Sequence, residues 1–151
     1  MTKKRSVTQT QAVLKYPPHW LTPEDLLTFV ELGPFSKRWD DLKLTDVDLS
    51  LVQTLIMIDP SGPPVIAGTG GLRKLRCGKD NVSKRDGYRV CYVYFEEFRL
   101  ILMVIIYAKN EIDTIPESHK PGIKKIIDRV RQRLESKPIR FGRRNDNMES
   151  L

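Results

Sequence analysis

The sequence predicts an α+β domain in which two N-terminal helices pack on a small antiparallel sheet and a further helix follows at the C-terminal end. Apolar residues recur at helical spacing up to residue 58, strand-like segments follow between residues 65 and 108, and helical spacing returns after Pro116. A chain of 151 residues is long enough for one packed domain with extensions at its ends. A single domain is therefore expected.

Both ends of the chain are expected to lie outside this domain. Residues 1–24 mix basic and polar side chains, and the prolines of Tyr16-Pro17-Pro18 oppose a regular helix or a central strand. The last residues are basic and follow the final helical pattern. We therefore expect an N-terminal extension over residues 1–24, the domain over 25–137 and a basic flexible tail over 138–151.

The first part of the domain is expected to hold one strand and two helices. Residues 26–32 (LLTFVEL) favour a first strand, although Thr22-Pro23 is also an acceptable helix start. Residues 35–43 carry two aromatic residues one helical turn apart. Thr45 is expected to cap a second helix that ends before Asp59-Pro60. The apolar positions of that helix recur at helical spacing: Val47, Leu51, Leu55 and Ile58.

A meander of three antiparallel strands should follow, over residues 72–77, 88–95 and 100–107. Glu96-Glu97 is expected to join the last two strands in a tight hairpin, and a long charged loop should join the first two. The final helix is expected to be basic and amphipathic, with its apolar face formed by Ile123, Ile126, Ile127, Val130 and Leu134.

Charge indicates the class of partner. The chain has 26 Lys and Arg residues against 19 Asp and Glu residues, a net charge of +7. Residues 71–93 hold seven Lys and Arg against two Asp, so a local excess of +5 lies there. A basic excess favours polyanions such as RNA, because each neutralised phosphate releases counterions.

No membrane segment, secretory signal, metal site or cofactor is expected. The longest apolar run, Leu100–Ala108, is too short to cross a bilayer, so we expect the protein to stay in the cytoplasm. Cys77 and Cys91 lack the spacing and the nearby histidines of a zinc site. Residues 68–71 (GTGG) lack the Lys-Ser/Thr ending of a phosphate-binding loop and instead indicate a tight approach to the strand.

Strand alternation predicts a cationic sheet surface. Lys74 and Arg76 should share one face while Leu75 and Cys77 occupy the other. In the next strand, the core face should hold Val90, Tyr92 and Tyr94, which leaves Arg89 outward. A solvated sheet face is the alternative interpretation. Like charges that face one another across a sheet repel, however. A phosphate-binding surface therefore explains the crowded cations better than a solvated face does.

Three ordered segments resemble the RelE superfamily, especially its HigB-type toxins. They are residues 68–76 (GTGGLRKLR), 87–90 (GYRV) and 107–111 (YAKNE), and the resemblance extends over residues 26–134. It implies a RelE-like fold and a toxin that cleaves messenger RNA on the ribosome. It also implies a cognate antitoxin protein that neutralises the toxin by direct binding.

The resemblance also implies roles for individual residues. Lys74 matches a basic strand position and becomes a candidate base or charge stabiliser, and Arg89 matches the arginine that grips the scissile phosphate. Tyr107 and Lys109 complete the candidate catalytic set. No tyrosine follows Lys109, unlike the best-known RelE pattern, which leaves the acid and base assignments open. The expected RNA-binding residues are Arg73, Arg76, Lys79, Lys84 and Arg85.

Arg73 has two interpretations, because a slip of one residue in strand register would exchange it with Lys74. Two other functions also remain open for the chain. One is a ParE-like toxin, which inhibits gyrase by binding protein. The other is a non-catalytic RNA-binding protein of the same fold.

Overall fold

The computed structural model describes residues 21–78, 87–108, 111 and 114–136. Its regular elements are a mixture of helices and strands, which confirms the α+β class. In chain order they are η2 (Pro23–Asp25), β2 (Thr28–Glu31), α2 (Gly33–Asp41), α3 (Asp46–Ile58), β3 (Arg73–Cys77), β4 (Tyr88–Phe95), η5 (Glu96–Phe98), β5 (Leu100–Ala108), η6 (Glu117–His119) and α4 (Lys120–Ser136).

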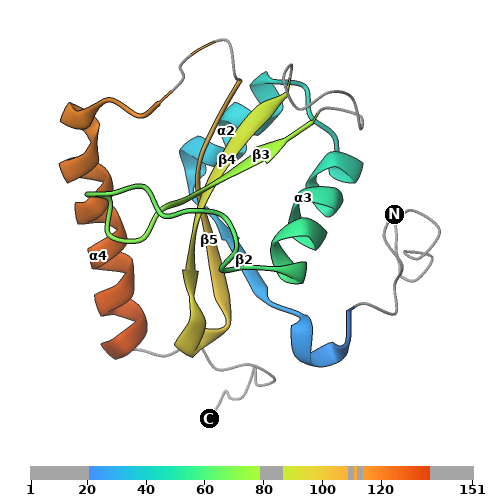
Figure 1. Cartoon of the computed structure of the whole chain (residues 1–151), viewed down its shortest axis with the longest axis horizontal. Coiled ribbons are helices and arrows are strands. Elements are labelled where there is room, and N and C mark those ends of the chain that lie inside the picture. The colour runs from blue at the N-terminus through green and yellow to red at the C-terminus, as the bar shows by residue number, and fades with distance from the viewer. Residues whose placement is uncertain (1–20, 79–86, 109–110, 112–113, 137–151) are drawn as a thin grey trace.

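The strands form one four-stranded sheet in the order β2-β5-β4-β3. Strand β4 pairs antiparallel with both β3 and β5, as the expected meander requires. Strand β2 pairs with β5 in parallel, from Thr28 beside Leu100 to Glu31 beside Met103. Figure 1 shows α2 and α3 on one side of this sheet and α4 on the other.

The expected antiparallel sheet is therefore wrong, because the parallel pairing of β2 makes the sheet mixed. The first strand favoured within residues 26–32 is present as β2, and the two helices lie between β2 and β3 in the chain. The physical reason is the length of the connections. A short link joins β4 to β5 and favours their antiparallel pairing, whereas the chain between β2 and β5 includes two helices and two strands and is long enough to allow parallel pairing.

The link between β4 and β5 is also longer than the expected two-residue hairpin. It consists of η5 and then Arg99, which takes the left-handed conformation with φ of 50°. The Arg99 guanidinium donates hydrogen bonds to the carbonyl oxygens of Glu24 and Leu26. These contacts fasten the segment before β2 to the hairpin and offset the strain of the left-handed backbone.

The first core lies between the sheet and the helices α2 and α3. Phe35 and Trp39 of α2 are buried there and stack with ring centroids 5.9 Å apart. Helix α3 begins as expected at Thr45, whose hydroxyl accepts from the Asp48 backbone N–H while the Asp48 carboxylate accepts from the Thr45 backbone N–H. On the sheet, the buried residues of this core include Val90, Tyr92 and Met103.

Helix α3 does not use the apolar stripe that its spacing suggested. Val52 and Ile56 are buried, whereas Val47 and Ile58, two members of that stripe, are 52% and 40% exposed. Helix α3 carries apolar residues around most of its circumference, so spacing alone leaves several faces possible. The position of the sheet decides which of them is buried.

The second core lies between the sheet and α4. Ile127 and Leu134 of α4 are buried against the opposite sheet face, where Cys91 and Val93 of β4 also lie. Strand β4 therefore has both faces covered, and seven of its eight residues are buried. This arrangement is a three-layer domain rather than a sheet with one solvated face.

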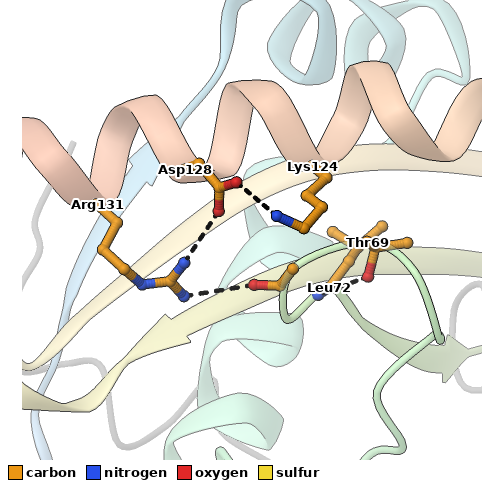
Figure 2. Close-up of polar contacts among 6 residues, drawn as sticks. Thr69, Leu72, Lys124, Asp128 and Arg131 are labelled. Atoms are coloured by element: carbon orange, nitrogen blue, oxygen red, sulfur yellow. Dashed lines mark hydrogen bonds and ion pairs between the residues drawn. The ribbon is translucent and has the colours of Figure 1, made fainter.

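The glycine-containing turn before β3 packs tightly against α4, as Figure 2 shows. The Asp128 carboxylate accepts from Lys124 at 2.8 Å and from Arg131 at 3.4 Å, and Arg131 also donates to the Gly70 carbonyl at 3.4 Å. The Thr69 hydroxyl accepts from the Leu72 backbone N–H at 3.0 Å. The glycines indicated a tight approach to the strand, whereas the close approach at Gly70 is to helix α4.

Replacing Gly70 by alanine should destabilise the domain. Gly70 has a φ of +82°, and a Cβ atom added there would lie 3.2 Å from Lys124 Cγ. A left-handed backbone costs a non-glycine residue about 1–2 kcal/mol, so we expect the free energy of unfolding to fall by at least about 1 kcal/mol in urea denaturation.

Gly122→Ala is the matched control, because Gly122 lies in α4 and a Cβ there meets nothing within 4 Å. Alanine is favoured over glycine inside a helix by roughly 0.5–1 kcal/mol, so this variant should be as stable as the parent or more stable. Equal stability of Gly70→Ala and the parent would contradict the packing described for the turn.

Candidate nucleic-acid interface

The sheet register brings four of the expected site residues onto one face. Arg76 pairs with Arg89, and Arg89 pairs with Tyr107, so the three form a row across β3, β4 and β5. Lys74 lies two residues before Arg76 and pairs with Cys91. We call Lys74, Arg76, Arg89 and Tyr107 the basic cluster.

The basic cluster belongs to the sheet face that α4 covers. Cys91 and Tyr107 lie in the core beneath α4, and Lys74 and Arg76 share this face by register. Leu75 and Cys77 belong to the opposite core. The expected alternation along β3 is thereby confirmed.

Exposure differs sharply within the basic cluster. Arg76 is exposed and Lys74 is half-buried, but Arg89 is only 7% exposed and Tyr107 only 4%. Arg89 therefore takes the expected face without projecting into solvent, because this face carries a second core. Only Arg76 and Lys74 are open to a ligand in this conformation.

The cations of the basic cluster lack acidic partners among the residues that the structure describes. No ion pair found there involves Lys74, Arg76 or Arg89. The contact of the Arg89 guanidinium is with the Tyr88 carbonyl oxygen, at 3.4 Å. A buried or crowded cation is unfavourable without an anionic partner. A phosphate group bound at Arg76 would therefore lower the repulsion among the cations of the basic cluster.

Arg73 is not part of the basic cluster. It pairs with Tyr92, whose side chain lies in the core beneath α2 and α3. Its guanidinium donates to the carbonyl oxygens of Ser61 at 2.8 Å and Pro63 at 2.7 Å. Arg73 therefore holds the connection between α3 and β3, and Lys74 is the residue that takes the cluster face.

The remaining expected site residues lie outside the described part of the chain. They are Lys79, Lys84, Arg85 and Lys109. By chain connectivity, residues 79–86 join β3 to β4 and residues 109–110 follow β5. These segments are attached at the end of the sheet that carries Arg76, Arg89 and Tyr107.

The two cysteines contribute to the two cores. Cys77 and Cys91 are both buried, on opposite faces of the sheet. Burial raises the pKa of the Cys91 thiol to about 12, and the positive charge of Lys74 opposes part of that rise. Among the described residues, no group of three or more His, Cys, Asp or Glu side chains is placed to hold a metal ion.

No helix of the described residues is long and apolar enough to span a bilayer. No family model matches the chain. The geometry of the basic cluster and the charges around it are therefore the basis for a functional proposal.

Alkaline pH should destabilise the fold through Cys91. The thiol keeps its proton to about pH 12 when folded and has an ordinary pKa of 9.0, so unfolding releases a proton between these limits. The stabilisation is complete below pH 9 and is lost as pH rises toward 12, by up to about 1.4 kcal/mol per pH unit. Urea denaturation between pH 8 and 11 measures this slope.

Cys91→Ala separates this effect from general alkaline unfolding. Burial also raises the pKa of Tyr92, so part of the slope should persist above pH 10 in the variant. A pH dependence in Cys91→Ala equal to that of the parent between pH 9 and 10 would show that the Cys91 thiol is not the group responsible.

Proposed function

We propose that the protein is the toxin of a type II toxin–antitoxin pair, a cytoplasmic endoribonuclease that cleaves messenger RNA on the ribosome. The observation that supports the proposal is the basic cluster, in which Lys74, Arg76, Arg89 and Tyr107 come from three adjacent strands and share one sheet face. RNA is a polyanion, and an exposed arginine beside a lysine can bind its phosphate groups.

The proposed reaction is attack of a ribose 2′-oxygen on the adjacent phosphorus. The bond between the 2′-oxygen and phosphorus forms, the bond from phosphorus to the 5′-oxygen breaks, and the products are a 2′,3′-cyclic phosphate and a 5′-hydroxyl. The 2′ proton leaves to a base, and the 5′-oxygen gains a proton. The reaction also needs stabilisation of the negative charge that builds on the phosphate oxygens.

Chemistry divides these tasks among the residues of the basic cluster. Arginine keeps its charge in proteins, so Arg76 and Arg89 are assigned to phosphate charge. Arg76 is exposed and would contact the phosphate directly. The buried Arg89 would stabilise the phosphate charge electrostatically from inside the domain. Lys74 is half-buried beside them and is the described residue best placed to transfer a proton.

Tyr107 has a different proposed role. At 4% exposure its ring offers no surface on which a base could stack, and it lies beside Arg89 in the register. We assign it to positioning Arg89. In this proposal the cognate antitoxin silences the enzyme by direct binding, and the ribosome presents the message.

Loss of either accessible cation should abolish cleavage without unfolding the protein. Lys74→Met keeps the aliphatic length of the side chain, and Arg76→Gln changes an exposed position. Removing a preorganised charge that acts on the transition state costs roughly 100- to 1000-fold in rate. We expect losses of this order for message cleavage on programmed ribosomes, with 2′,3′-cyclic phosphate ends in the parent products.

Lys37→Gln is the control, because Lys37 is an exposed cation on α2, across the sheet from the basic cluster. It should cleave at the parent rate, and all three variants should show cooperative thermal unfolding. Parent-like cleavage by Lys74→Met and Arg76→Gln would refute the assignment. Failure of DNA supercoiling with intact messages would favour gyrase inhibition, and binding of RNA without cleavage would favour a non-catalytic protein.

A further inference from the structure

Helix α4 and the sequence after it form the most basic part of the chain. Between Lys120 and Arg144 there are ten Lys and Arg residues against two Asp and Glu residues, a local net charge of +8. This excess exceeds the +7 of the whole chain. Solubility alone would not require this much positive charge in one segment. The positions of the charged side chains on α4 therefore bear on what the helix could bind.

Several α4 cations already have partners or packing roles on the side facing the glycine turn. Lys124 and Arg131 both bind the Asp128 carboxylate, and Arg131 also lies over the Phe95 ring with 5.1 Å to its centroid. Figure 2 shows these side chains directed along the flank of α4 toward the turn. Lys120 pairs with Glu117 at 2.7 Å. Of these residues, Arg131 fixes α4 to the domain through Gly70 and Phe95.

Three other cations lie on the outer side of the helix. Lys125, Arg129 and Arg133 are exposed, and no ion pair among the described residues involves them. At 3.6 residues per turn they follow one line along the helix, away from the buried Ile127 and Leu134. We call Lys125, Arg129 and Arg133 the outer α4 row.

The two acidic residues of α4, Asp128 and Glu135, form no ion pair with the outer α4 row among the described residues. The other residues on this side include Gln132 and Ser136, which are exposed and uncharged. Asp128 lies on the flank and is engaged by Lys124 and Arg131. Like charges four residues apart destabilise a helix by a few tenths of a kcal/mol. The outer α4 row therefore destabilises α4 slightly, and a bound polyanion would offset this repulsion.

The geometry points to the outer α4 row as a second RNA-binding surface, one that binds the phosphate backbone outside the basic cluster. The inference rests on the proposed function in taking RNA as the ligand. The row extends over about 12 Å at 1.5 Å per residue, enough to contact more than one phosphate. Because α4 covers the sheet face that carries the basic cluster, both surfaces lie on the same side of the sheet.

RNA fits this surface better than a membrane does. A membrane-bound amphipathic helix inserts its apolar face, but the apolar face of α4 is buried against the sheet through Ile127 and Leu134. Among the described residues of α4, Ile126 is the exposed large apolar side chain, at 42%. A row of cations with one apolar neighbour suits a ligand that offers regularly spaced negative charges better than it suits a membrane. An acidic protein partner remains as the competing outcome of the experiment.

The test compares two double variants with equal loss of charge. Lys125→Gln/Arg129→Gln removes two members of the outer α4 row, and Lys37→Gln/Lys43→Gln removes two exposed cations on the side of α2. The probe is a single-stranded RNA with 2′-O-methyl groups, which cannot be cleaved by 2′ attack. Its affinity for the full chain is measured across a range of KCl concentrations.

The slope of log affinity against log salt should become shallower by about 1.4 in the α4 variant, since each phosphate contact contributes about 0.7 for a single strand. The control slope should equal that of the parent. The charge-preserving variant Lys125→Arg/Arg129→Lys should bind like the parent, which shows that charge carries the binding, and cooperative thermal unfolding of Lys125→Gln/Arg129→Gln excludes an effect of altered folding.

Three results would overturn the inference. One is a parent-like slope for Lys125→Gln/Arg129→Gln, and another is an equal change in the control. The third is displacement of the RNA by poly-glutamate at equal charge concentration, since it would identify an acidic protein as the preferred ligand. The probe is not a substrate, so the proposed function can fail in cleavage assays while this surface still binds RNA, and the reverse also holds.

Discussion

The structure depends on the coverage of β4 from both sides. Successive residues of this strand enter alternate cores, Tyr92 beneath α2 and α3 and Val93 beneath α4, so neither face is left for solvent. A charged residue on such a strand is buried wherever it falls, and Arg89 is the case observed. The open parts of the cationic face must then come from β3, the neighbouring strand at the edge of the sheet.

Local signals predicted much of this fold. Thr45 and Asp48 form the cap that begins α3, and alternation along β3 placed Lys74 and Arg76 together on one face. The glycines at 68–71 indicated a tight approach, and all three have positive φ, although the element approached is α4 rather than the strand. Each of these features depends on residues near one another in sequence, where backbone geometry and hydrogen bonding act directly.

Other features depend on contacts between distant segments, and the sequence pattern did not determine them. The parallel pairing of Thr28 with Leu100 is set by where the chain returns after two helices and two further strands. The burial of Arg89 follows from the position of α4, which the alternation of β4 does not encode. The register also separated Arg73 from Lys74, which composition alone could not do.

The hydrogen bonds from Arg99 to the carbonyl oxygens of Glu24 and Leu26 bear on where a tag can be attached to the protein. They hold the start of the domain at the hairpin end of β5, whereas Tyr107 lies near the other end of that strand. Tyr107 lies seven positions after Leu100 in an extended chain, which is about 23 Å at 3.3 Å per position. An affinity tag or a fluorescent fusion joined ahead of residue 21 is thus anchored at a distance from the cations of β3 and β4.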